Sequence, residues 1–140
     1  MTVNGLFDNT TKLLIKVMSL RSAKADIIAG NLANIDTPGY KARKVDFEQQ
    51  LQKVVGILPE NGLPLTRTDK RHLPLNGDLT DVRAVVSERQ NDLAGFDGNT
   101  VDLDQEMAAL AENKINYLAT VEMLRKKLAM LKNAIVEGGK

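Results

Sequence analysis

The side chains of this sequence that could perform chemistry do not form a recognisable catalytic set. His72, the one histidine, stands in the polar run TRTDKRHLPL, and no partner lies at the spacing that a metal site or a catalytic pair requires. Ser19, Ser22 and Ser87 have no nucleophile-elbow context, and the chain has no cysteine, so covalent catalysis has no candidate. The sequence predicts no catalytic residue, cofactor or metal, and His72 is interpreted as a surface or turn residue.

The acidic run DGNTVDLDQE, residues 97–106, superficially resembles a calcium-binding loop. An EF-hand needs oxygen ligands at positions one, three and five, glycine at six and glutamate at twelve, whereas here Gly98 directly follows Asp97. The favoured interpretation is a tight Asp-Gly turn that leads into a helix. Carboxylates in the first turn of that helix would face the positive end of its dipole.

The charge balance points to protein partners. With 19 basic and 18 acidic residues the net charge is +1, which gives no field to attract nucleic acid or anionic lipid. Acidic residues between the basic clusters and an aromatic content of 4% also argue against a nucleic-acid site. The basic clusters are Lys41, Arg43 and Lys44; Arg67, Lys70 and Arg71; and Arg125, Lys126 and Lys127. No apolar run reaches the roughly 18 residues that span a bilayer, and no cleavable signal is apparent, so we expect no direct membrane insertion.

The elements that must position these residues begin with a helix over roughly residues 9 to 33, inside an N-terminal helical unit of residues 6–34. Its apolar residues recur at spacings of three, four and seven. One edge of the stripe contains Leu6, Leu13, Val17, Leu20 and Ile27, and the other contains Leu14, Met18, Ala25, Ile28 and Leu32. The helix must stop at Thr37-Pro38-Gly39, because Pro38 fixes φ and Gly39 can supply the positive φ of a type II turn.

The next segment, 35–55, is predicted to contain this turn, an extended basic stretch and a short helix that places Phe47, Leu51 and Val54 or Val55 on one face. Residues 56–98 contain three of the four prolines and several glycines, which excludes long helices. We expect an irregular middle of loops with a short strand at VRAVVSE, residues 82–88.

The C-terminal helix, 99–137, has the clearest pattern. Asp102 and Gln105 have the spacing of a capping box, and Gly138 and Gly139 follow the helix. Apolar residues continue at spacings of four and three, as in a coiled-coil seam. The seam is Leu103, Met107, Leu110, Lys114, Tyr117, Val121, Leu124, Leu128, Leu131 and Ile135. Lys114 is either a snorkelling stem with its charge in water or a selector of register or partner.

A single helix with such a seam exposes an apolar ridge, so a partner must cover it. The predicted fold is mainly α: one domain of residues 1–140 whose two long terminal helices pair antiparallel as a coiled-coil-like rod around an irregular middle. Both stripes are wider than one partner needs. Some apolar surface should therefore remain for other subunits.

The run NLANIDTPGYKAR, residues 31–43, resembles the signature of flagellar rod, hook and hook-associated proteins. The matching residues are Asn31, Leu32, Ala33, Asn34, Thr37, Gly39, Tyr40 and Lys41. The C-terminal third is similar to the proximal-rod members of that family at Asp97-Gly98-Asn99, Val101-Asp102, Glu106, Asn113 and Tyr117. Thr100 and Lys44 depart from the family pattern. The short middle leaves no room for the extra domain of distal-rod and hook proteins.

This resemblance implies a subunit that is exported unfolded through the flagellar type III apparatus, without a cleaved signal, and that polymerises into the periplasmic rod of the basal body. The implied partners are its own copies, other rod proteins, the rod-base adaptor protein and the export apparatus. A chain without cysteine suits such a journey between redox compartments.

Two hypotheses of function follow. The leading one is a structural subunit of the proximal rod that transmits torque. Its assembly interface is the whole seam, Lys114 included, together with the first N-terminal edge. The signature turn sets the angle between helix and outer segment and consists of Asn31, Asn34, Thr37, Pro38, Gly39, Tyr40 and Lys41. The alternative is a soluble coiled-coil adaptor or export chaperone that never polymerises. An enzyme is a distant third.

Overall fold

A computed structural model describes residues 9–54, 79, 82–89 and 96–138 of the chain. The elements in chain order are α1 (Asn9–Ala33), β1 (Arg43–Asp46), α2 (Glu48–Val54), β2 (Val85–Glu88) and α3 (Leu103–Glu137). The predicted fold class is confirmed, since the chain is mainly helical with two long terminal helices and a small two-stranded sheet between them. Leu6 and His72 lie outside the described residues.

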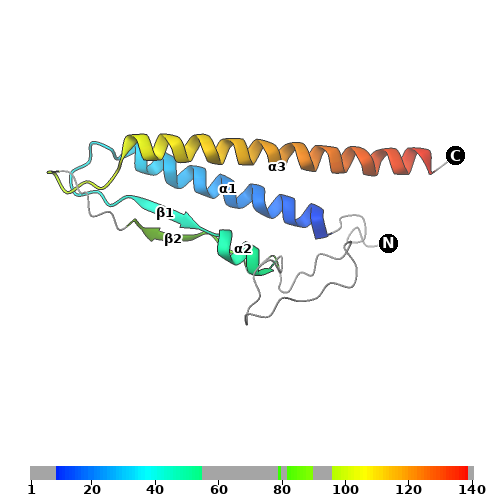
Figure 1. Ribbon diagram of the computed structural model, residues 1–140, viewed down its shortest axis with the longest axis horizontal. Coiled ribbons are helices and arrows are strands. Elements are labelled where there is room, and N and C mark those ends of the chain that lie inside the picture. The colour runs from blue at the N-terminus through cyan, green and yellow to red at the C-terminus, as the bar shows by residue number, and fades with distance from the viewer. Residues whose placement is uncertain (1–8, 55–78, 80–81, 90–95, 139–140) are drawn as a thin grey trace.

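The molecule is elongated and has three layers (Figure 1). α3 forms one side, α1 lies in the middle, and the β1–β2 pair with α2 lies on the other side of α1. The chain runs along α1 toward one end of the molecule and returns along α3, so the two long helices are antiparallel, as the apolar stripes predicted. With 35 residues, α3 is about 52 Å long and extends past the start of α1.

The two ends of α3 follow from local chemistry. The Asp102 carboxylate accepts a hydrogen bond from the backbone N–H of Gln105 at 3.1 Å, which confirms the predicted N-cap, and Asp104 and Glu106 add negative charge to the first turn. At the other end, Gly138 keeps a right-handed φ of −74° and donates its N–H to the Ala134 carbonyl. Gly138 therefore continues the helical geometry instead of adopting a left-handed cap.

The small sheet pairs β1 with β2 antiparallel, from Arg43 opposite Glu88 to Asp46 opposite Val85. The strand expected within VRAVVSE is confirmed, and the extended basic stretch after the turn is its partner. Pairing with a segment more than 35 residues away decides that β1 is a strand, because its four residues RKVD carry little periodicity of their own.

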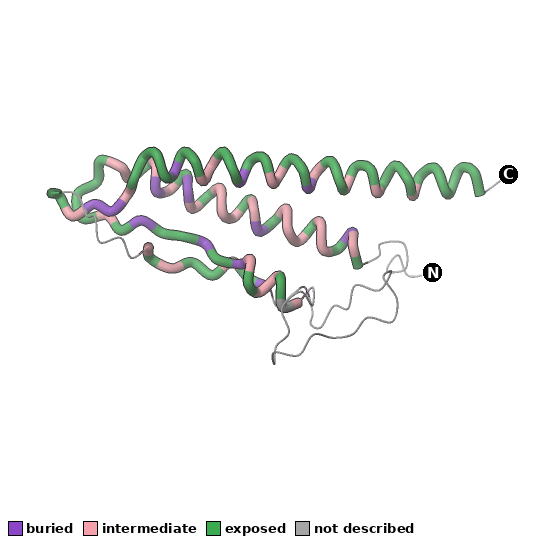
Figure 2. The backbone as a smooth tube through the Cα atoms, viewed as in Figure 1, coloured by how far each residue is buried: buried purple, intermediate pink, exposed green. Residues whose placement is uncertain are grey.

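The hydrophobic core lies between α1 and the sheet with α2, not between the two long helices. Its buried members are Leu20, Val45, Phe47 and Val82, and Ile27, Leu51, Val54 and Ala84 pack against them. Figure 2 shows buried residues along β1 and just before α2, and others along α1 and α3. The predicted apolar face of the short helix, Phe47, Leu51 and Val54, is confirmed.

An ion pair ties α2 to α1 beside this core. The Lys24 ammonium lies 3.2 Å from the Glu48 carboxylate and 5.9 Å from the centre of the Phe47 ring. Partial burial by itself would raise the pKa of Glu48, but hydrogen bonds from the backbone N–H groups of Glu48 and Phe47 and the Lys24 charge outweigh it, so this pKa lies below its ordinary value. Because both side chains are partly exposed, the pair stabilises the fold only modestly.

Candidate assembly site

The signature turn has the geometry that its sequence predicts. Gly39 has a φ of +71°, and the Tyr40 N–H donates to the Thr37 carbonyl at 3.2 Å, as in a type II turn with Pro38 at its first corner. Asn34 terminates α1 by donating its side-chain amide to the Gly30 carbonyl at 2.8 Å. The chain therefore leaves α1 in one fixed direction.

Asn31 joins the last turn of α1 to the beginning of β1. It is fully buried, its amide donates to the Arg43 carbonyl at 2.7 Å, and its side-chain oxygen accepts from the Arg43 N–H at 2.9 Å. The same oxygen accepts a longer bond from the Tyr40 hydroxyl at 3.4 Å. One side chain thus satisfies both backbone groups of the first strand residue, which holds the turn against the helix.

Asn99, just before α3, binds the signature turn from the C-terminal part of the chain. Its amide nitrogen lies 2.9, 2.7 and 2.9 Å from the carbonyl oxygens of Asn34, Ile35 and Thr37, and its side-chain oxygen accepts from the Val101 N–H at 2.8 Å. An NH₂ group has two hydrogens, so one of them is shared between two carbonyls. This one side chain connects the end of α1 to the start of α3.

Backbone pairing completes the connection. The Gly39 N–H donates to the Asp97 carbonyl, the Thr100 N–H donates to the Tyr40 carbonyl, and the Lys41 ammonium donates to the Gly98 carbonyl. Gly98 has a φ of +77°, which confirms a tight Asp-Gly turn. We call residues 31–43 together with 97–101 the junction, because these segments form one hydrogen-bonded unit.

Asn99→Ala is expected to destabilise the chain by about 2–3 kcal/mol, because it leaves three partly buried carbonyl oxygens without their donor. A shift of the urea unfolding midpoint at unchanged slope measures this loss. Asn133→Ala, on the exposed side of α3, is the matched control and should change stability by less than about 0.5 kcal/mol. Equal stability of the two variants would contradict the role assigned to Asn99.

The interface between α1 and α3 contains polar residues at a spacing of seven. Glu106, Asn113 and Thr120 are 0%, 5% and 8% exposed. The Asn113 amide donates to the Arg21 carbonyl at 2.8 Å, and the Arg21 guanidinium donates to the Asn113 side-chain oxygen at 3.4 Å. Leu110, Tyr117 and Leu124 are half-buried on the same side of α3. The two helices therefore meet through a mixed polar and apolar seam.

Glu106 is the most deeply buried charge of this seam. Its carboxylate lies 2.8 Å from the Arg89 guanidinium, which follows β2 and also donates to Gln105 at 2.8 Å. The contact between Glu106 and Arg89 is an ion pair without good hydrogen-bond alignment, and neither carboxylate oxygen has a hydrogen-bond partner among the described residues. The pair connects the sheet to α3.

Only part of the seam predicted on α3 faces α1. Leu110, Tyr117, Val121, Leu124 and Leu131 are half-buried, whereas Leu103, Met107, Lys114, Leu128 and Ile135 are exposed. On the N-terminal stripe, Leu13 and Val17 are half-buried, and Leu20 and Ile27 belong to the core of the chain itself. The assembly role of these residues stays a prediction, and Leu20 is the one least available to a neighbour.

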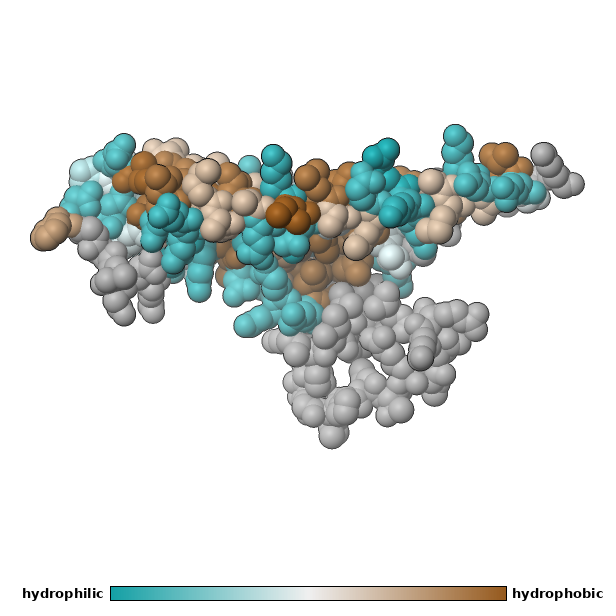
Figure 3. All heavy atoms as spheres, turned by 45° about the horizontal axis from the view of Figure 1, so that its top comes forward, coloured by the Kyte–Doolittle hydropathy of each residue, from teal (hydrophilic) through white to brown (hydrophobic). Residues whose placement is uncertain are grey.

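Many apolar side chains of α3 are exposed. They are Leu103, Met107, Ile115, Leu118, Met123, Leu128, Met130, Ile135 and Val136, each between 41% and 68% exposed. Figure 3 shows apolar groups spread along this helix between charged ones. Leu103, Met107, Ile115 and Leu118 fall on one side of the helix through spacings of four, eight and three, and we call them the outer ridge. Within the described part of the chain, no helix is apolar and long enough to cross a bilayer.

Comparison with known proteins decides between the two hypotheses. A sequence model described as "Flagella basal body rod protein" matches residues 17–41, from the middle of α1 through the signature turn. "Flagellar basal body rod protein FlgB" of Proteus mirabilis (strain HI4320) is 34% identical over 133 residues, which cover 94% of this chain and 96% of that protein. The chain belongs to the FlgB family.

Two further FlgB proteins support the assignment. That of Bacillus subtilis (strain 168) is 37% identical over 140 residues, 97% of this chain and 99% of that protein. That of Escherichia coli (strain K12) is 34% identical over 125 residues, 88% and 90% of the two chains. Membership of the FlgB family makes this chain a structural subunit of the flagellar basal body rod, which confirms the rod-subunit part of the leading hypothesis, and its assembly interface stays a prediction. The adaptor or chaperone alternative has no support.

The sequence identified the signature turn of this FlgB relative but did not predict what Asn99, Thr100 and Glu106 do in the fold. Asn99 was part of the acidic run and of the family motif, with no contact to the turn expected. Thr100, a departure from the family pattern, is buried, and its hydroxyl accepts from the Ala42 N–H at 2.9 Å. Glu106 was expected only as a member of the acidic run and of the family motif, although the recurrence of polar residues every seven positions could have indicated a buried polar line.

Proposed function

We propose that this chain builds the proximal part of the rod by polymerising through its paired terminal helices, and that the assembled rod transmits torque. The observation that carries the proposal is the outer ridge, an apolar surface on a rigid helix about 52 Å long. Water does not favour such a surface, so burying it against neighbouring subunits supplies a driving force for assembly.

The junction supports the proposed mechanical role. Asn31 and Asn99 fasten both ends of the turn by side-chain hydrogen bonds of 2.7 to 2.9 Å, where a flexible linker would let the two helices swing independently. A load applied to α3 therefore passes into α1 through several short bonds in parallel. The signature turn would in this way fix the angle between the helix pair and the outer sheet.

The proposed partners are copies of this chain, other rod proteins and the rod-base adaptor protein. We further propose export through the flagellar type III apparatus without a cleaved signal and a purely structural role without catalysis. Three features support these proposals: the resemblance of the signature turn, a chain without cysteine, and the names of the FlgB relatives, which describe rod proteins.

Leu124→Asp tests the proposal, because it places a charge where α3 is half-buried against α1 and its neighbours. In a strain whose own rod gene is replaced by this variant, we expect normal synthesis, no rod in isolated basal bodies and loss of swimming. Leu124→Met is the matched control and should swim normally, since it keeps size and polarity. Normal swimming of Leu124→Asp, or a wild-type chain found only in cytosol, would count against a rod subunit.

A further inference from the structure

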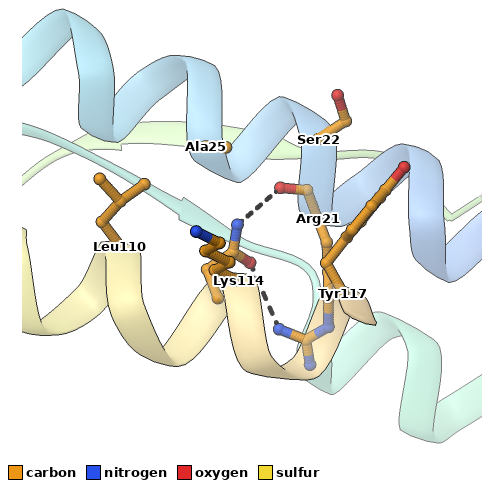
Figure 4. Close-up of a pocket in the computed structure, with 7 residues that line it drawn as sticks. Arg21, Ser22, Ala25, Leu110, Lys114 and Tyr117 are labelled. Atoms are coloured by element: carbon orange, nitrogen blue, oxygen red, sulfur yellow. Dashed lines mark hydrogen bonds between the residues drawn. The ribbon is translucent and has the colours of Figure 1, made fainter. Parts of the chain in front are cut away.

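A hollow of about 300 Å³ opens between α1 and α3. Ala25 of α1 and Leu110 and Tyr117 of α3 give it an apolar lining, and Arg21 and Lys114 add positive charge. Figure 4 shows Leu110 and Tyr117 extending from α3 toward α1 on either side of Lys114. A hollow of this size is at the small end for binding sites, so it fits one side chain better than a peptide.

Phe96 is the most exposed large apolar side chain of the described residues, at 116% of the reference exposure. It stands where the chain turns into α3, and this segment forms the end of the molecule opposite the C-terminus of α3 (Figure 1). The next residues are held firmly. The Asp97 carbonyl accepts from the Gly39 N–H at 3.0 Å, and its carboxylate accepts from the Asn99 N–H at 3.1 Å.

An exposed aromatic ring next to a hydrogen-bonded turn is a typical anchor residue of an interface, because burying it removes a large apolar surface from water. The lining of the hollow has the apolar surface and the cation that the exposed Phe96 and Asp97 side chains could bind. Its apolar lining can cover the ring, the Lys114 ammonium can pair with the neighbouring Asp97 carboxylate, and a cation beside an aromatic face adds attraction. The aromatic ring and the carboxylate of the tip thus complement the apolar lining and the cation of the hollow.

We propose that Phe96 of one copy inserts into the hollow between α1 and α3 of a second copy of this chain, with Asp97 facing Lys114. The inference rests on the proposed function and names one contact within it. It also assigns Lys114 the role of partner selector.

The contact is compatible with continued growth. The tip and the hollow are different surfaces, so each copy offers one of each, and a head-to-tail arrangement of this contact extends along a series of copies. Lys114 lies 11 residues into α3 after Leu103, roughly 16 Å along the helix. The hollow therefore lies on the side of the helix pair, so the proposed contact joins a second copy laterally and not end to end.

Disulfide trapping tests the contact cleanly because the native chain has no cysteine. Two differently tagged full-length chains, one with Asp97→Cys beside the intact Phe96 ring and one with Ser22→Cys at the hollow, are expressed together, and isolated basal bodies are oxidised. We expect a disulfide-linked heterodimer of the two tagged chains. The control replaces Ser22→Cys by Asn133→Cys, which lies on α3 about 24 Å beyond Tyr117.

A heterodimer yield no higher than that of the Asn133→Cys control, in basal bodies that contain both chains, would overturn this contact and leave the rod function standing. Absence of every tagged chain from the basal bodies would instead overturn the function. A second measurement uses no cysteine and lets wild-type and Phe96→Ala chains compete for incorporation into the rod. Incorporation of Phe96→Ala should fall roughly tenfold or more relative to the wild type, whereas incorporation of Phe96→Leu should fall much less. Equal incorporation of Phe96→Ala would also overturn the proposal.

Discussion

Ile115→Asp is expected to abolish rod assembly while the isolated chain stays as stable as the wild type. Ile115 is 68% exposed at the centre of the outer ridge, so an aspartate there remains hydrated in the monomer. In an assembled rod the same carboxylate would be buried against apolar neighbours without a partner, at a cost of several kcal/mol for each contact. Each subunit of the rod would bury one such carboxylate. The total free-energy cost for the polymer is therefore far larger than the cost for one contact between two subunits.

Three measurements check this expectation. The urea midpoint of the purified variant should lie within about 0.5 kcal/mol of the wild type. Basal bodies from a strain that carries only the variant should lack a rod, and its cells should not swim. Ile115→Val, which keeps the apolar surface, and Gln52→Asp, an equally charged change at an exposed position of α2, should both assemble. A motile Ile115→Asp strain would show that the outer ridge faces solvent in the rod.

The fold could be predicted from sequence because its decisive signals are local. Apolar spacing defines α1 and α3, Pro38 and Gly39 fix the turn, and Asp102 caps α3. The strand β1 and the exact face of α3 that meets α1 could not be predicted in the same way. Both depend on partners distant in sequence, and a stripe wider than one partner needs does not say which of its edges is covered.

The junction shows the same limit at the level of single side chains. The signature turn could be recognised as a unit, but its stability depends on Asn99, whose amide reaches carbonyl groups more than 60 residues earlier. Nothing in the local sequence distinguishes an asparagine that caps its own turn from one that holds a remote segment. The polar seam is similar: Asn113 lies among apolar residues of a helix, and only its bonds to Arg21 explain why it is buried.

Arg89→Ala should destabilise the chain by about 3 kcal/mol or more, because it removes the only cation within ion-pair distance of the fully buried Glu106 carboxylate among the described residues. Thermal or urea unfolding of the purified variant measures the loss. Arg83→Ala is the matched control, since this exposed arginine lies just before β2, and its removal should change stability by less than about 0.5 kcal/mol. A cost below about 1 kcal/mol for Arg89→Ala would contradict the argument.

A second substitution separates the loss of attraction from the burial of an unpaired charge. Glu106→Leu in the Arg89→Ala background removes the carboxylate and fills its place with apolar atoms, so the double variant should be more stable than Arg89→Ala alone. Rod assembly by the double variant then shows whether the Arg89–Glu106 ion pair has a role other than stabilising the fold. If the double variant recovers its unfolding midpoint but not swimming, the link between β2 and α3 serves to fix the sheet relative to the helix pair, because that geometry is the one property an apolar replacement does not restore.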